Sequence, residues 1–171
     1  MSTLITFLND DSNLSTLKEN IATALLDNVN VLLSNTTAYS PTGITSTTLV
    51  MAGYGKTFTP TRTGRVLIVM LCTLNNNTVG DGSAIQVNYG TGAPPAAGAA
   101  ATGTQASALI TVKWDAATLT TGGTTGTKQV VLVGIVTGLV LGTAYWLDAA
   151  YESVTGGTTT LTINAAYVVE F

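Results

Sequence analysis

The chain has 171 residues and a formal net charge of −3, and charged residues make up only 9% of it. This length suits one principal domain with an appendage, whose core needs no disulfide. The six cations are scattered singly, so we expect no nucleic-acid partner. The chain has no histidine, the commonest general base and metal ligand. We therefore expect no enzyme and neither a cofactor nor a metal site.

The first predicted element is an amphipathic helix over residues 14–33, where apolar side chains recur every three or four positions. Asp10, Asp11 and Ser12 precede it and supply a capping oxygen and negative charge. Such a helix can pack on its own domain, pair in a short trimeric coiled coil, or dock on a larger particle. Residues 34–48 are rich in Ser, Thr and Asn and predict a linker. We therefore expect a docking or trimerisation region over 1–48 and a β-domain over 49–171. The apolar stripe of the helix consists of Leu14, Leu17, Ile21 and Leu25.

Beyond residue 48 the pattern has period two. Residues 85–89, 110–114 and 161–165 alternate between apolar and polar, which predicts strands with one solvated face. Turn residues at 75–82 and at Gly156-Gly157 predict hairpins between the strands that flank them. About eight strands result, and no helical pattern interrupts them. The expected fold is mainly β, an antiparallel jelly-roll β-sandwich.

Two strands, residues 66–72 and 130–136, are apolar on both faces. One face is expected to lie on the opposing sheet and the other on another subunit of a homotrimer. Cys72, the only cysteine, ends the first run and is expected to be a small buried hydrophobe. The residues expected at the trimer interface are Val66, Ile68, Met70, Val131 and Val133.

Residues 129–147 carry no charge and have the hydropathy of a membrane helix. Thr137-Gly138 and Gly142-Thr143 divide this run into two strand-length pieces, so we expect two strands and no membrane insertion. Residues 90–105 are rich in Gly, Ala and Pro and predict an exposed loop.

One segment gathers the aromatic residues Tyr145, Trp146 and Tyr151. Such a cluster is a candidate ligand surface, because Tyr and Trp stack on sugars and anchor interfaces. Packing in the core or an interface is the favoured alternative, because consecutive strand residues point to opposite faces. Asp148 and Glu152 are the nearest approach to a paired-carboxylate site, but they lie about 13 Å apart along a strand. We expect both to be solvated or ion-paired.

Three stretches resemble trimeric bacteriophage virion domains. They are the segment TPTRTGRV at 59–66, the loop YGTGAP at 89–94 closing with ATGT at 101–104, and the stretch from VTGL at 136–139 through GTAYW at 142–146 to GGT at 156–158. The resemblance covers residues 59–171. It implies a jelly roll similar to tumour-necrosis-factor and complement C1q heads, and no active site.

The resemblance implies a structural component of a bacteriophage virion, a trimeric capsid decoration (cement) protein or a head-fibre protein. Its partners would be its own copies and the major capsid protein or another virion protein. It would be made in the host cytoplasm and assembled on the surface of the particle. The alternative is the receptor-binding head of a tail fibre, which grips a host surface glycan or protein.

Overall fold

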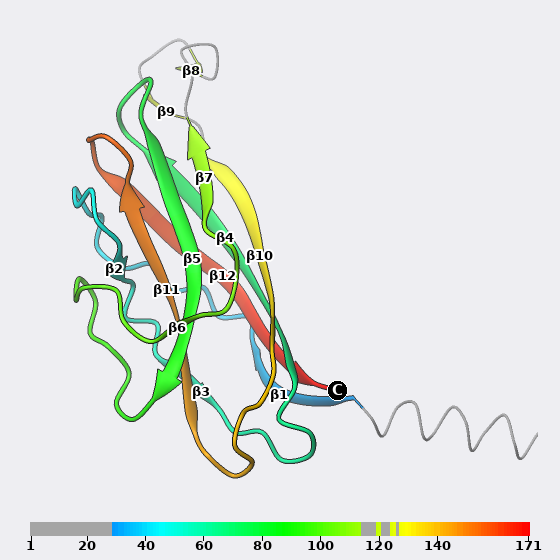
Figure 1. Ribbon diagram of the computed structural model, residues 1–171. Coiled ribbons are helices and arrows are strands. Elements are labelled where there is room, and N and C mark those ends of the chain that lie inside the picture. Colours follow the sequence, from blue (N-terminus) through cyan, green and yellow to red (C-terminus); the bar gives the residue numbers. More distant parts are fainter. Residues whose placement is uncertain (1–28, 114–118, 121–123, 126) are drawn as a thin grey trace, which may run out of the picture.

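The computed structural model describes residues 29–113, 119–120, 124–125 and 127–171. Two antiparallel sheets face each other as a sandwich (Figure 1). The predicted mainly β, antiparallel architecture is confirmed for these residues. The four-stranded sheet has the order β1 (Asn30–Asn35), β12 (Thr159–Glu170), β4 (Val66–Asn76) and β10 (Lys128–Val136).

The second sheet has six strands, most of them shorter. Its order is β2 (Val50–Met51), β11 (Tyr145–Ser153), β5 (Gly82–Thr91) and β6 (Thr104–Gln105). In addition, β3 (Lys56–Phe58) pairs with β11, and β7 (Ile110–Lys113) pairs with β5. A separate pair is formed by β8 (Leu119–Thr120) and β9 (Thr124–Thr125). The long strands β5 and β11 therefore form the centre of this sheet.

The core lies between the two sheets. Alternate side chains of β4, β10 and β12 point inwards and meet those of β5 and β11, as their period-two burial shows. Cys72 is among them, and burial raises the pKa of its thiol to about 12. A thiol that stays protonated is unreactive, so Cys72 is the buried hydrophobe that was expected. The largest fully buried apolar side chains include Met51, Ile68, Met70, Leu74, Leu132, Leu147 and Ile163.

The uncharged run at 129–147 forms β10, a loop and the beginning of β11, so the prediction of two strands is confirmed. Within the described ranges, no helix is long and apolar enough to span a membrane.

The predicted hairpins are wrong. β4 and β5 follow each other in sequence but lie in different sheets, and so do β11 and β12. The turns between them carry the chain across the sandwich instead. Asp81 holds two of these turns together, because its carboxylate accepts hydrogen bonds from the backbone N–H groups of Thr155 and Gly156, both at 2.8 Å. Turn residues mark where a strand ends, but not the sheet to which the next strand belongs.

The predicted linker and the end of the predicted helix are also corrected. Residues 30–35 form β1, which pairs with β12. Tyr39 and Ile44 then form β-bridges with Ile163 and Thr159 of the same strand. The boundary expected after residue 48 therefore falls inside the β structure, because a Ser/Thr-rich segment can lie along a sheet as well as form a linker. The helix residues Leu14, Leu17, Ile21 and Leu25 lie outside the described residues.

Candidate functional site

In the half of the four-stranded sheet where β4 begins, the outward side is apolar across all four strands. Along β4 and β10 the register places Val131 opposite Leu71, Val133 opposite Val69 and Ile135 opposite Leu67. Val131 and Val133 are each 54% exposed and Ile135 is 62% exposed. We call this surface the outer face. It consists of Val31, Leu67, Val69, Leu71, Val131, Val133, Ile135, Tyr167 and Val169.

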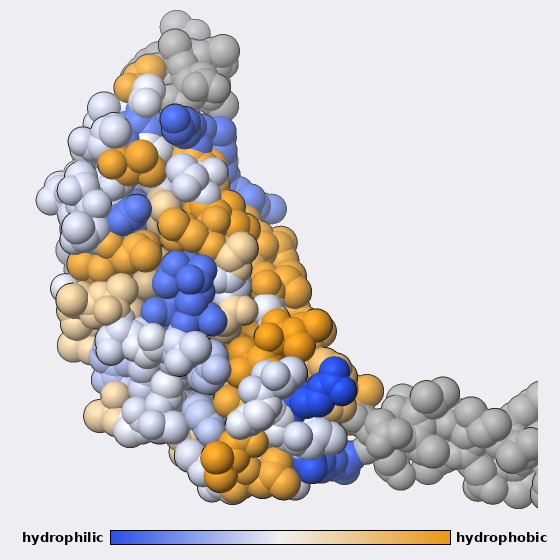
Figure 2. All heavy atoms as spheres, viewed as in Figure 1, coloured by the Kyte–Doolittle hydropathy of each residue, from blue (hydrophilic) through white to orange (hydrophobic). Residues whose placement is uncertain are grey.

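No residue of the outer face carries a charge. Figure 2 shows the resulting hydrophobic band along the flank of the molecule that β10 forms. Soluble monomers rarely expose so continuous an apolar surface, and patches of this kind mark interaction sites. The outer face is therefore the candidate functional site.

The predicted interface residues divide between the two sides of the sheet. Val131 and Val133 lie on the outer face, whereas Val66, Ile68 and Met70 are fully buried in the protein's own core. The prediction is therefore wrong for Val66, Ile68 and Met70. The residues of β4 that point outwards are Leu67, Val69 and Leu71. Inside a uniformly apolar run, period two does not say which set points out.

The flanks of the run carry the signal that was missed. Arg65 and Thr73 are polar and have the same parity as Leu67, Val69 and Leu71. Side chains two residues apart share a face of a strand. The odd-numbered residues of β4 therefore point outwards, in line with the polar residues Arg65 and Thr73 at the two ends of the run.

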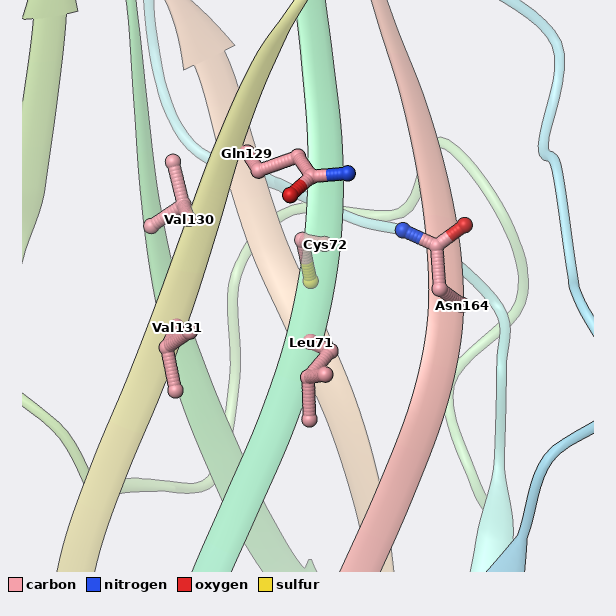
Figure 3. Close-up of a pocket in the computed structure, with 6 residues that line it drawn as sticks. All are labelled: Leu71, Cys72, Gln129, Val130, Val131 and Asn164. Atoms are coloured by element: carbon pink, nitrogen blue, oxygen red, sulfur yellow. The ribbon is translucent and has the colours of Figure 1, made fainter.

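A small hollow of about 130 Å³ opens between β4, β10 and β12 (Figure 3). A β-bulge in β12 between Ile163 and Ala165 displaces the pairing there, and the Asn164 amide donates to the hydroxyl of Thr73 at 2.8 Å. Most of the lining is apolar and none of it is charged, so the hollow suits an apolar side chain from a partner. The lining residues are Leu71, Cys72, Gln129, Val130, Val131 and Asn164.

The aromatic cluster is not an exposed surface. Tyr145, Trp146 and Tyr151 are all buried, with Trp146 only 3% exposed. The Trp146 indole N–H donates to the carbonyl of Thr91 at 3.2 Å, and the Tyr151 hydroxyl donates to that of Thr42 at 3.0 Å. The ligand-surface interpretation is thus corrected in favour of packing in the core, because the loop 90–105 covers the tryptophan.

A matched pair of glycine variants tests this cover. Gly103 and Gly92 both have left-handed backbone, with φ of 78° and 81°. A Cβ at Gly103 would overlap the Trp146 ring and lie 2.5 Å from the Tyr89 carbonyl oxygen, whereas one at Gly92 meets nothing within 4 Å. We expect Gly103→Ala to lower the free energy of unfolding by about 2 kcal/mol more than Gly92→Ala does. Urea unfolding measures both, and equal losses would show that the loop does not press on the ring.

The buried carboxylate of Asp148 is held by backbone groups. It accepts hydrogen bonds from the N–H groups of Gly53 and Tyr54, both at 3.0 Å, and of Ala149 at 2.8 Å. Burial raises its pKa to about 6, although these bonds oppose the shift. Glu152 is half-buried on the same strand, four residues along. The arrangement fastens the turn at Gly53 to β11 and does not pair two carboxylates.

Stability should depend on pH through Asp148. A folded-state pKa above the unfolded value means that the native state binds the proton more tightly. This contribution is complete below about pH 4 and is lost as the pH rises through about 6. We expect the free energy of unfolding to fall over this interval in the native chain and to change less in Asp148→Asn. Urea unfolding at pH 4, 5, 6 and 7 gives both slopes, and identical slopes would contradict the assignment.

Other kinds of site find less support. Among the residues that the structure describes, no three acidic, cysteine or histidine side chains gather in a group that could hold a metal ion. The buried carboxylates Asp81, Asp148 and Glu170 accept bonds from backbone N–H groups, which gives each a structural role. Neither the protein-family models nor the curated proteins include a match to this chain.

Proposed function

We propose that this chain is a structural component of a bacteriophage virion, a homotrimer that decorates the capsid as a cement protein or forms a head fibre. The observation that carries the proposal is the uncharged, apolar outer face. Two copies of such a face meet without like-charge repulsion, and each Å² removed from water contributes about 25 cal/mol. A structural protein with such an interface has no need of a catalytic site.

We propose a jelly-roll connection for the sandwich, and the strand order supports it. Passing from β4 to β5, from β7 to β10, from β10 to β11 and from β11 to β12, the chain changes sheets each time. Such crossings are expected of a jelly roll and are not expected of consecutive hairpins. The resemblance of residues 59–171 to phage virion domains implies the same fold and a trimer.

The partner on the particle is the major capsid protein or another virion protein. The burial of Tyr145, Trp146 and Tyr151 favours decoration over receptor binding, because it leaves the receptor-binding alternative without its aromatic surface. The exposed apolar area lies on a sheet face, which suits contact with another protein better than contact with a sugar.

Two measurements test the proposal. Light scattering coupled to size exclusion is expected to give three times the chain mass at micromolar concentration, and a monodisperse monomer would overturn the trimer. Purified chain is then added to phage particles that lack it. We expect electron microscopy to show added density on the capsid. Density on the tail, or none at all, would overturn the decoration role.

A further inference from the structure

The net charge of the chain lies entirely in residues 1–28. This segment holds four acidic residues and one lysine, and the rest of the chain is balanced, with five of each sign. In the described part the carboxylates of Asp81, Asp148 and Glu170 are buried, whereas Arg62 and Arg65 are exposed. The acidic segment is thus opposite in charge to the surface around Arg62 and Arg65. The charged residues of the segment are Asp10, Asp11, Lys18, Glu19 and Asp27.

One end of the sandwich joins exposed arginines to exposed apolar side chains. There the backbone N–H of Leu139 donates to the Gly64 carbonyl at 3.0 Å, and that of Gly142 donates to the Pro60 carbonyl at 2.8 Å. These bonds hold the arginine loop against the loop that follows β10. We call this surface the end patch. It consists of Arg62, Arg65, Val140, Leu141 and Phe171.

The end patch is open to solvent. Val140 is 63% exposed and Leu141 is 49% exposed. The Arg65 guanidinium lies over the Phe171 ring, 5.0 Å from its centroid, so the cation borders the apolar surface. In Figure 2 the hydrophobic atoms of the loop between β10 and β11 lie beside hydrophilic atoms at this end. A partner for this surface needs an apolar stripe flanked by negative charge.

The described chain begins at the same place. The side-chain amide of Asn30 donates to the hydroxyl of Thr61 at 3.1 Å, next to Arg62. Figure 1 shows the beginning of β1 beside the C-terminus. Leu25 is four residues before Val29, a distance that the chain covers with at most about 14 Å. The segment before residue 29 therefore reaches the end patch without a linker.

We propose that residues 14–28 bind the end patch, on the same copy or a neighbouring one. The stripe residues Leu17, Ile21 and Leu25 would cover the apolar part of the patch, and Asp27, the last acidic residue before β1, would lie closest to the arginines. Of the three roles that the sequence allows for the helix, the proposal favours packing on the β-domain over a coiled coil or docking on a larger particle. The end patch adjoins the outer face beside Leu67 and Val169 but shares no residue with it, so the inference does not require the trimer.

Cleavage after Lys18 by a lysine-specific protease measures whether the segment is covered. In Val140→Asp/Leu141→Asp, two carboxylates replace the apolar contact with the stripe and repel the acidic segment, and we expect roughly a tenfold or greater rise in the cleavage rate. Val79→Asp, at an exposed position beyond the other end of β4, should leave the rate unchanged. An unchanged rate in the double variant would overturn the proposal. Light scattering on the same variants reports the trimer independently.

An exchange of charges tests whether the arginines of the end patch contribute to binding the segment. Arg62→Glu/Arg65→Glu should also accelerate cleavage after Lys18. Adding Asp27→Arg should restore part of the protection, because the new arginine then faces the introduced glutamates. A rate that stays high in this three-site variant would show that the arginines do not meet this segment.

Disulfide trapping locates the contact. Ile21→Cys with Leu141→Cys should oxidise to a disulfide, whereas Ile21→Cys with Val79→Cys should not. Cys72 does not compete, because it is buried and its thiol stays protonated. A bond within or between chains shows which copy provides the patch. Equal trapping in both pairs, or in neither, would overturn the proposal.

Discussion

Glu170→Ala is expected to lower the free energy of unfolding at pH 7 by about 3 kcal/mol. Glu170 is the last residue of β12, and its side chain is fully buried. One carboxylate oxygen accepts bonds from the N–H groups of Arg62 (2.9 Å), Thr63 (2.7 Å) and Gly64 (3.0 Å), and the other accepts from Thr61 (3.0 Å). Alanine removes these acceptor contacts and that of the Thr61 hydroxyl (3.3 Å), and the loop that carries the arginines of the end patch loses its anchor.

The effect should disappear in acid. Burial raises the pKa of Glu170, but the four backbone hydrogen bonds outweigh burial and bring it to about 2, below the ordinary value of 4.5. A depressed folded-state pKa means that the stabilisation is complete above about pH 4.5 and is lost as the pH falls towards 2.

Urea unfolding at pH 7 and pH 3 therefore should show a smaller difference between the native chain and Glu170→Ala at the lower pH. Glu170→Gln should lose less than alanine, because its oxygen can keep the three bonds on one side while its NH₂ group faces the Thr61 N–H. Glu152→Ala, on a half-buried carboxylate of β11, is the control and should change stability by less than about 1 kcal/mol. A loss that small in Glu170→Ala at pH 7 would contradict the role assigned to Glu170.

The strands could be predicted where side chains alternate, because the period belongs to the strand itself. The partners of the strands could not. Val31, Leu32 and Leu33 fit the spacing of the preceding helical stripe, yet Val31 and Leu33 pair with β12 near residue 169. That pairing joins segments far apart in the sequence, and β-propensity depends on such tertiary neighbours more than on the local pattern.

The buried carboxylates were missed for a different reason. Asp148 and Glu170 bind backbone N–H groups, which almost every residue possesses, so no residue type marks the partner. A carboxylate that looks isolated in the sequence can therefore be fully bonded in the fold. Two residues of the outer face, Val131 and Val133, could be predicted, because a strand that is apolar on both faces must be covered on both of them.

Val131→Asp/Val133→Asp is expected to convert the proposed trimer to monomers. Both side chains point out of β10 and are more than half exposed, so the fold of each copy should tolerate the change. In an assembly that covers the outer face, each aspartate would be an unpaired charge removed from water. We expect the dissociation midpoint to rise by about a thousandfold, measured by light scattering over a dilution series.

Two further variants separate the face from the core. Met70→Asp places its charge on the inner side of the adjacent strand β4, among fully buried side chains, and should unfold the chain by removing about 4 kcal/mol or more. Val79→Asp, in the exposed turn after β4, should leave both mass and stability unchanged. If Val131→Asp/Val133→Asp remained trimeric with an unchanged midpoint, the outer face would not be the contact between copies. Because Met70 and Val131 lie on opposite sides of one sheet, unfolding by the first and dissociation by the second would show that the doubly apolar strands serve the core with one face and assembly with the other.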